Sequence, residues 1–402
     1  MSAIKLAHRV TSMRVSPSVA AAQKVRDLKA AGRQILDLTV GEPDFDTPDT
    51  IKAAAMSAIT SGQTKYTPVN GTLALRQAIR HDYQSRLSIE VGMDEICVGG
   101  GAKQILFLAL MATVEAGDEV IIPAPYWVSY PDMVMANGGT PVIASCGEEV
   151  GFKLTPAALE AAITEHTRWV VLNSPSNPTG AAYHPDELDA LAKVLRRHSH
   201  VMVLSDEIYD RIWYADFKVA SLVTVAPDLK DRCLVVNGVS KSYAMTGWRI
   251  GYASGPVPLI NAINKLQSQM SSCPSSISQA AAAAGLTGDQ SGVEETVKVY
   301  RARRDRAHAL INAIPGLSCA LQDGAFYLFP CCKGVIGKQT PEGKVIASDQ
   351  DFVLYLLDSA GVATVHGGAY GLEPYFRLST ATSMEVLEAA CAAIAQAVAK
   401  LR

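Results

Sequence analysis

The sequence predicts an α/β fold, with a mostly parallel seven-stranded sheet covered by helices and a smaller α+β domain. Between about residues 95 and 254, short apolar runs alternate with longer segments of helical periodicity. This alternation is typical of a parallel sheet with helices on both faces. The chain has 402 residues, more than a single hydrophobic core usually holds. After residue 290, a long charged helical segment precedes mixed strand and helix patterns, which indicates the second domain.

The expected domain division follows this change in pattern. We expect residues 48–290 to form the large domain, and residues 1–47 together with 291–402 to form the small one. Residues 1–16 are expected to be an N-terminal arm. Pro17 suits the first turn of a helix that Gly32 stops.

Each element is predicted from its apolar period and its flanking turn residues. The sheet strands are predicted at 95–98, 119–122, 140–144, 169–172, 201–204, 233–236 and 249–253. Helices are predicted at 17–31, 49–61, 72–87, 105–114, 256–270, 275–286, 293–313, 349–360 and 384–399. Further strands are predicted at 34–40, 317–321, 325–329 and 375–378. Residues 41–48 form a shaped loop, and the glycine- and lysine-rich residues 333–343 are expected to be an exposed loop.

Composition excludes several classes of function. The formal net charge is −3 and no basic tract occurs, so nucleic acid is not an expected partner. No apolar run reaches the ~18 residues of a membrane helix, and the first residues lack a secretory pattern. The eight cysteines are scattered without metal-type spacing, so no metal is predicted. We therefore expect a cytoplasmic protein with reduced thiols and no membrane partner.

One lysine and one nearby arginine suggest carbonyl and phosphate chemistry. Lys241 lies in a turn-prone segment between two predicted strands, and a buried lysine amine loses its charge readily. Arg249 could hold a phosphate through its guanidinium. Gly101, Ala102 and Lys103 open a helix, where free backbone N–H groups also suit a phosphate. Structural alternatives remain open: Lys241 would be a surface lysine in a loop, and the glycines would form an ordinary turn between a strand and a helix.

Other polar and aromatic residues follow the predicted strands. Trp127 could stack on a flat ring. Asn177, held extended by the next proline, presents its amide to the strand-end crevice. Asp206 could pair with a protonated pyridine nitrogen or cap the next helix, and Tyr209 could bond a ring oxygen. With Arg377 as a partner for a substrate carboxylate, the set is complete for pyridoxal phosphate (PLP) chemistry.

These motifs together resemble the class I aminotransferases of fold type I, most closely the bacterial aspartate aminotransferase branch. The series runs nearly end to end and is much more specific for the family than for the substrate. In order, it comprises GEPDFDTP at 41–48, KYTPVNG at 65–71, GGAKQ at 100–104, PYWVSY at 125–130, NSPSNPTG at 173–180, SDEIY at 205–209, SKSYAMTGWRIGY at 240–252 and FRLS at 376–379.

The resemblance implies a PLP-dependent transaminase with defined catalytic residues. Lys241 would form the Schiff base with the cofactor and then move the proton between the substrate and the cofactor. Asp206 would keep the pyridine nitrogen protonated, while Tyr209 and Asn177 would bond the ring oxygen. Trp127 would stack on the ring and border the substrate.

The resemblance also implies how the cofactor phosphate is held. Arg249 and the backbone of Gly101, Ala102 and Lys103 would bind it. Tyr66 would reach the phosphate of the neighbouring subunit, which implies a homodimer with shared active sites. Gly238 stands where some relatives have a phosphate-binding serine, so that contact is expected to be missing.

Substrate binding is implied by a further group of residues. Arg377, the backbone of Gly41 and Asn177 would bind the α-carboxylate of the substrate. In this branch a lysine at the position of Lys103 is associated with the distal carboxylate of aspartate or glutamate; the alternative is a solvent-facing lysine. Arg14 matches a basic position linked in some relatives to acidic substrates, including prephenate.

The expected function is transfer of the amino group of L-aspartate or glutamate to 2-oxoglutarate or oxaloacetate by a ping-pong mechanism in amino acid metabolism. An aminotransferase of broader, aromatic or prephenate specificity remains an open alternative. A PLP-dependent C–S lyase or a cyclopropane-forming synthase is less favoured. A ligand-sensing regulator on this fold is the non-enzymatic alternative.

Overall fold

The computed structural model describes residues 4–11, 13 and 17–402, and one seven-stranded sheet lies at its centre. The strand order is β2-β8-β7-β6-β5-β3-β4. Strand β8 is antiparallel to β2 and β7, and the other pairs are parallel. The predicted seven-stranded, mostly parallel sheet is therefore confirmed. The strands are β2 (Ile96–Gly99), β3 (Glu119–Ala124), β4 (Thr140–Ser145), β5 (Thr167–Asn173), β6 (Met202–Asp206), β7 (Cys233–Gly238) and β8 (Gly251–Ser254).

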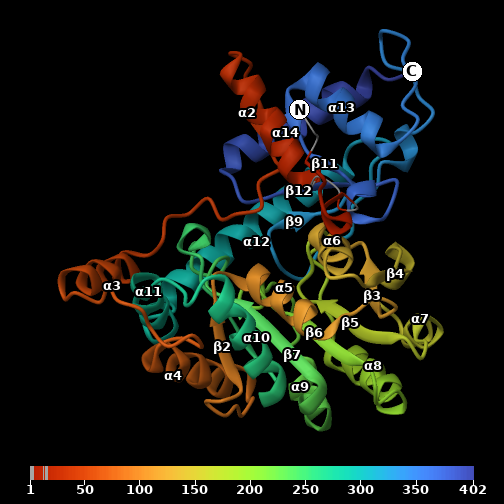
Figure 1. The fold of residues 1–402 in the computed structure, drawn as a ribbon. Coiled ribbons are helices and arrows are strands. Elements are labelled where there is room, and N and C mark those ends of the chain that lie inside the picture. The colour runs from red at the N-terminus through yellow and green to blue at the C-terminus, as the bar shows by residue number, and fades with distance from the viewer. Residues whose placement is uncertain (1–3, 12, 14–16) are drawn as a thin grey trace.

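Helices cover both faces of this sheet (Figure 1), because alternate strand residues point to opposite sides. In β5, Trp169 and Val171 pack into one core while Val170 and Leu172 pack into the other. The first core is covered by α5 (Ala102–Thr113), α6 (Ser129–Ala136) and α10 (Val257–Met270). The second is covered by α3 (Asp49–Thr60), α4 (Leu73–Asp82), α7 (Pro156–Ala162), α8 (Pro185–Arg197), α9 (Leu222–Val225) and α11 (Ser276–Thr287).

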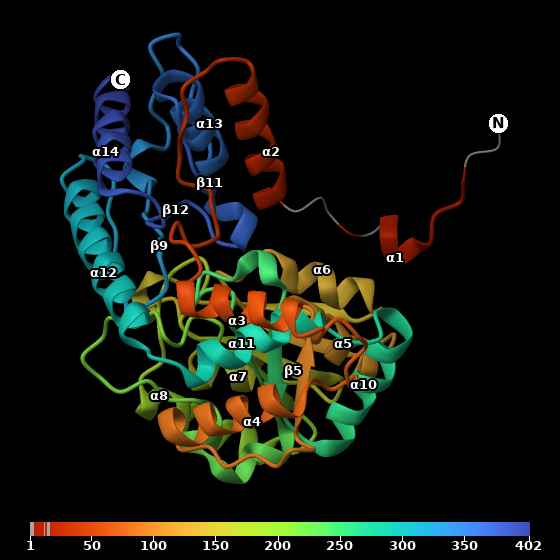
Figure 2. The same ribbon diagram turned by 90° about the vertical axis from the view of Figure 1, so that its left-hand side faces the viewer.

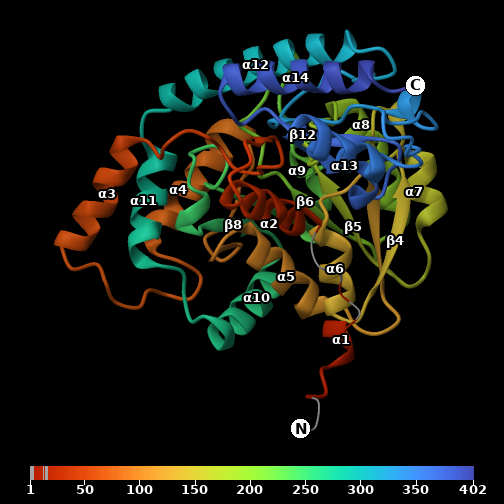
Figure 3. The ribbon, with the colours of Figure 1, turned by 90° about the horizontal axis from the view of Figure 1, so that it is seen from above.

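A separate lobe stands above the carboxyl ends of the strands (Figures 1 and 2) and has its own core. Strands β11, β12 and β9 form an antiparallel sheet, and β1 pairs in parallel with β10. Helices α12 and α14 lie side by side along one edge (Figure 3). The elements are α2 (Pro17–Ala30), β1 (Leu36–Asp37), α12 (Ser291–Asn312), β9 (Tyr327–Leu328), α13 (Asp349–Ala360), β10 (Val362–Ala363), β11 (Val365–His366), β12 (Phe376–Ser379) and α14 (Met384–Ala399). The domain division at residues 48 and 290 stays a prediction, which the separate cores support.

Three predicted strands are absent or much shorter than expected, and one of them, predicted at 325–329, is reduced to the two residues of β9. Residues 317–321 form only an isolated bridge at Ser318, because the Asn312 side chain takes both backbone groups of Cys319, at 2.9 and 3.0 Å. The strand predicted at 34–40 is reduced to β1. The Asp37 carboxylate accepts the Thr39 N–H at 3.0 Å, so this backbone donor is not available to a neighbouring strand.

Three further segments differ from the expected pattern. The helix predicted at 72–87 divides into α4 and a π-helical turn, η1 (Tyr83–Leu87). The segment expected to be an irregular arm contains a short helix, α1 (His8–Thr11). Residues 333–343 are mostly exposed but anchored, since Val335 is fully buried and Gln339 N–H donates to the Arg402 carbonyl at 2.9 Å.

None of the helices formed by residues 4–11, 13 and 17–402 combines the length and apolar character required to cross a membrane.

Candidate active site

A cavity of about 600 Å³ lies at the carboxyl ends of the sheet strands, below the upper lobe. Tyr66 does not line it and has an exposed side chain. Gly101 lies next to it as the residue before α5, and Arg14 lies outside the described residues. The other predicted site residues all line the cavity: Gly41, Ala102, Lys103, Trp127, Asn177, Asp206, Tyr209, Lys241, Arg249 and Arg377. The fold thus gathers predicted residues from distant parts of the chain.

The Lys241 amine is a candidate nucleophile in this cavity. Its Nζ donates to the Gly41 carbonyl at 2.6 Å. Burial is the main reason why the pKa of Lys241 is lowered to about 8; the positive charges of Arg377 and Arg249 act in the same direction, whereas the carboxylates of Glu42 and Asp206 act against it. A lysine with a lowered pKa is partly neutral near physiological pH and can attack a carbonyl carbon.

Asp206, the last residue of β6, is a buried carboxylate facing the same cavity. Tyr130 Oη donates to its Oδ2 at 2.7 Å, and the Ile208 N–H lies 3.3 Å from its Oδ1. Burial raises the pKa of Asp206 to about 6, while these two hydrogen bonds favour the ionised form. Such a carboxylate suits a cationic ring nitrogen. Tyr130 was missed as a site residue in the sequence, although it ends the segment PYWVSY at 125–130 that carries Trp127.

Tyr209 has a partner from the other lobe. Its hydroxyl lies 2.9 Å from the hydroxyl of Tyr327 in β9. Burial raises the pKa of both side chains, so both hydroxyls stay protonated; one donates to the other, which keeps its own proton for a further acceptor. Nothing in the sequence distinguished Tyr327 from the apolar core residues beside it.

Arg377 is a buried guanidinium held by oxygen atoms that carry no charge. It donates to Asn177 Oδ1 at 3.0 Å and to the Thr39 carbonyl at 2.6 Å, and it lies 4.5 Å from the ring of Tyr327. Within residues 17–402 its Nε has no hydrogen-bond partner, and no carboxylate lies within ion-pair distance. Asn177 is itself fixed by its backbone N–H, which donates to Asn173 Oδ1 at 2.9 Å. A buried cation without a counter-ion is a ready site for a substrate carboxylate.

An anion seat is formed where α5 begins. Gly101 has φ +99°, and a Cβ there would overlap the Arg249 guanidinium. Arg249 donates to the Thr246 carbonyl at 2.8 Å and reaches the Gly100 carbonyl at 3.4 Å. The partial positive charge of the helix terminus and the guanidinium therefore act on the same space, which suits a phosphate.

Lys103 leans over the indole of Trp127, with Nζ 4.7 Å from the ring centroid. Burial and the positive charge of Arg249 lower the pKa of Lys103. No carboxylate of the described chain pairs with it. At Gly238, a Cβ would lie 3.0 Å from the Ile250 carbonyl, so tight packing leaves little space for a serine.

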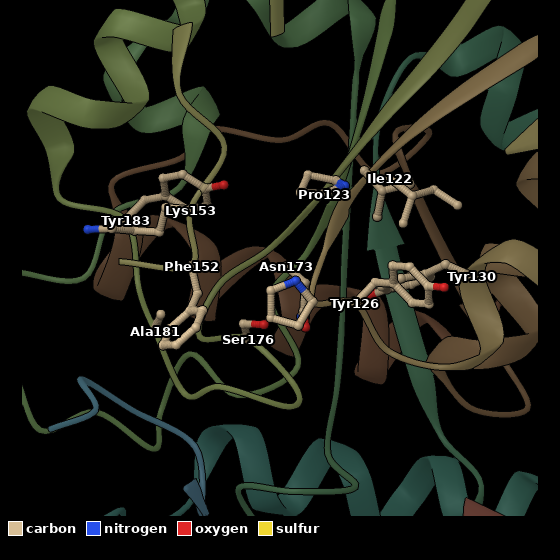
Figure 4. Close-up of a pocket in the computed structure, with 12 residues that line it drawn as sticks. Ile122, Pro123, Tyr126, Tyr130, Phe152, Lys153, Asn173, Ser176, Ala181 and Tyr183 are labelled. Atoms are coloured by element: carbon tan, nitrogen blue, oxygen red, sulfur yellow. The ribbon is translucent and has the colours of Figure 1, made fainter. Parts of the chain in front are cut away.

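A much smaller cavity lies behind the wall of the site (Figure 4). Tyr130 and Asn173 belong to both cavities, and Phe152, Lys153 and Tyr183 are among the ten further residues that line the small one. Its volume of about 20 Å³ is enough for one water molecule but not for a substrate.

Comparison with known proteins supports the interpretation that the geometry of the cavity suggests. The profile of the family "Aminotransferase class I and II" matches residues 33–394. A probable aspartate/prephenate aminotransferase of Rhizobium leguminosarum bv. phaseoli is 52% identical over 386 residues, covering 96% of each chain. The crystal structure of the aspartate aminotransferase from Rhizobium meliloti has a TM-score of 0.98 at 50% identity and covers 100% of both chains. The Thermus thermophilus aspartate aminotransferase with maleate has a TM-score of 0.91 at 37% identity, covering 98% of this chain and 100% of its own.

Proposed function

Because the chain belongs to the class I and II aminotransferases, we propose that it transfers the amino group of L-aspartate or glutamate to a 2-oxo acid with PLP as cofactor. The observation that carries the proposal is the convergence of Lys241, Asp206 and Arg377 on one cavity. The weakly basic amine suits the aldehyde of PLP, and the buried carboxylate suits its ring nitrogen. The guanidinium without a counter-ion suits the carboxylate of the substrate.

The described side chains fit PLP as a bound group. The anion seat of Arg249 and the start of α5 would hold its phosphate, and Trp127 would lie against its ring. Asp206 would hold a proton at the ring nitrogen, and Tyr209 would donate to the ring oxygen. When bound, PLP supplies the aldehyde and an electron-withdrawing ring.

The chain's own residues would carry the remaining steps. Arg377 binds and orients the α-carboxylate of the amino acid, with Asn177 fixing the guanidinium. The Lys241 amine then takes the proton from the α-carbon, for which its lowered pKa suits it. In the second half of the ping-pong cycle, Lys241 would deliver a proton to the α-carbon that comes from the 2-oxo acid.

From the position of Lys103 we propose that the enzyme prefers dicarboxylic substrates. Its ammonium lines the cavity without a carboxylate partner among the described residues, so it is available for the distal carboxylate of the substrate. A Lys103→Met variant is expected to raise KM for aspartate about tenfold or more, since one charge-assisted bond contributes about 1.5–3 kcal/mol. The KM for a monocarboxylic donor should change little.

A panel of amino donors and oxo-acid acceptors tests the function. Aspartate or glutamate should convert the holoenzyme to its amino form, seen as a change in cofactor absorbance, and 2-oxoglutarate or oxaloacetate should reverse it. Failure with every dicarboxylic amino acid would refute the proposed specificity. Prephenate and the aromatic oxo acids belong in the same panel, because two relatives with "aspartate/prephenate" in their names are about half identical to this chain.

The proposed assembly is a cytoplasmic homodimer with shared sites. Tyr66 has an 89% exposed side chain, and the apolar side chains of Met56, Leu73 and Met270 are also exposed. Exposed apolar groups of this kind favour burial against a second subunit. Tyr66 would then reach the phosphate in the partner's cavity.

A further inference from the structure

Behind Asp206 and the segment that carries Lys241 lies a hydrogen-bonded group of four charged residues and one asparagine that the proposed chemistry does not use. We name it the back-face cluster. It consists of Asp82, Arg86, Asp210, Arg211 and Asn237. The side chains of the two carboxylates are only 5% and 2% exposed, so these charges are held away from solvent.

Asp210 is the centre of the cluster. Its Oδ2 accepts from Arg86 Nη2 at 2.6 Å and from Asn237 Nδ2 at 2.7 Å. The Asn237 side chain accepts in turn from the Gly238 N–H at 2.7 Å. Asp210 therefore connects the π-helical turn η1, which carries Arg86, with the end of strand β7.

Asp82 extends the cluster toward the lysine segment. It accepts from Arg86 Nη2 at 3.3 Å and from the Arg211 guanidinium. Arg211 lies 5.4 Å from the ring of Tyr243, which is two residues after Lys241. Arg211 and Tyr243 also donate to the same side-chain oxygen, that of Gln290, at 3.2 and 2.8 Å.

The cluster therefore contacts both catalytic segments from behind. The turn after β6 presents Asp206 and Tyr209 to the cavity and Asp210 to the opposite side. Strands β6 and β7 are neighbours, and Asn237 lies four residues before Lys241. Any shift of the cluster would move the carboxylate and the amine relative to each other.

Stability alone does not explain such an arrangement. Removing ionised groups from water is costly, and apolar side chains of similar size often stabilise a core equally well or better. Hydrogen bonds between arginine and carboxylate, however, are directional and fix relative positions. The charges that shift the pKa of Lys241 are those of Glu42, Arg377, Arg249 and Asp206, and none belongs to the cluster. The influence that its hydrogen bonds can exert on the amine is geometric.

We propose that Asp210 and Arg86 are positioning residues, which hold the Asp206–Tyr209 turn at a fixed place relative to the Lys241 segment. This inference rests on the proposed aminotransferase function. A displacement of reacting groups by about 1 Å can lower a rate about 100-fold, so small relaxations of the cluster should be visible in turnover.

The test uses the holoenzyme and four variants: Asp210→Asn, Arg86→Met, their double variant, and Arg86→Lys as the conservative replacement. We measure kcat, KM for aspartate, the visible circular dichroism of bound PLP and thermal unfolding. Lys230→Met is the matched control, because Lys230 pairs with Glu95 at 2.9 Å, beside the opposite, amino end of β2 in the same sheet.

Asp210→Asn and Arg86→Met should lower kcat about 10- to 100-fold while KM changes less than about threefold. The visible dichroism, which reports the fixed orientation of the cofactor, should weaken, and Arg86→Lys should recover part of both signals. The double variant should be no worse than the poorer single one, since both remove the same contact. Lys230→Met should lower the unfolding temperature only.

Wild-type kcat and dichroism in the folded variants, with only a lowered unfolding temperature, would overturn the inference. If a single variant does not fold, the double variant decides, because it leaves neither buried charge without its partner. A wild-type protein that binds PLP but does not transaminate would contradict the proposed function instead, and the dichroism would still test the cluster.

Discussion

At the scale of single residues, the site depends on two groups whose pKa values move toward each other. Burial lowers the pKa of Lys241 to about 8 and raises that of Asp206 to about 6. Between these values the carboxylate is ionised, while the neutral fraction of the amine increases with pH. Groups with shifted pKa values that face one cavity are typical of catalytic sites.

The amine gives the first prediction. In protein freed of PLP, the neutral form of Lys241 increases as pH rises through about 8 and is complete above it, because its pKa is lowered. The rate of absorbance change on adding PLP should therefore level off near pH 9. Lys241→Ala should lack this phase and all transamination. A rate that keeps rising to about pH 10.4, the ordinary lysine value, would contradict the lowered pKa.

The carboxylate gives the second prediction. The hydrogen bond from Tyr130 lowers the pKa of Asp206, so Tyr130→Phe should raise it above about 6. Activity requires the ionised form, and the acidic limb of the kcat/KM profile should move to higher pH. Tyr183→Phe is the control, since this buried tyrosine accepts from the Leu154 N–H and does not contact Asp206. An unchanged acidic limb in Tyr130→Phe would remove Tyr130 from the proposed site.

Residues with a motif of their own could be predicted from sequence, whereas their supporting residues could not. Asp206 ends an apolar run, Arg377 interrupts one, and Lys241 lies in the turn between two of them, which marks all three. The Tyr327 hydroxyl meets Tyr209 only after the two lobes pack, and the Thr39 carbonyl meets Arg377 only after the smaller lobe folds. Their roles depend on tertiary contacts that no local pattern records.

At the scale of elements, the start of α5 gives the third prediction. Gly101→Ala would strain a backbone at φ +99° by about 1–2 kcal/mol and displace the Arg249 guanidinium. The Kd for PLP, measured by titration of the cofactor-free protein, should rise about tenfold or more. Gly117→Ala is the matched control, because Gly117 has φ +100° with nothing within 4 Å. Equal effects of both variants on Kd would show that strain, not the anion seat, is responsible.

The strands of the seven-stranded sheet were predicted more completely than those of the small lobe, where β12 was predicted but the strand at 317–321 is absent, for a physical reason. The central strands are buried on both faces, so each has an apolar run that marks it. Residues 317–321 are also apolar, but the Asn312 side chain occupies the backbone groups of Cys319. When a side chain, rather than a neighbouring strand, bonds the backbone groups of a segment, the hydrophobic pattern of the sequence does not reveal it.

At the scale of the whole molecule, the proposed homodimer gives the fourth prediction. If Tyr66 completes the site of its partner, then Lys241→Ala and Tyr66→Ala chains should complement each other. A hybrid dimer would have one site with Lys241 from one chain and Tyr66 from the other. Co-expressed variants with different tags, purified as hybrids, should be more active than either variant alone. No gain in the hybrid would contradict shared sites.

The lobes meet at the cavity, so the site exists only in the complete fold. Lys241 belongs to the lobe with the seven-stranded sheet, whereas Arg377 belongs to the smaller lobe. Gly41 lies in the loop that leads from β1 of the smaller lobe to α3. The sequence indicated both lobes, but not the hydrogen bond from Lys241 to the Gly41 carbonyl that joins them.

Reduction of the holoenzyme with borohydride, followed by peptide mass spectrometry, tests the proposed role of Lys241 most directly. Borohydride makes the bond between PLP and an amine permanent. The pyridoxyl group should be found on the peptide that contains Lys241, and addition of aspartate before reduction should remove the label. A label on another lysine, or label that aspartate does not remove, would contradict the role of Lys241 as the amine that carries the cofactor.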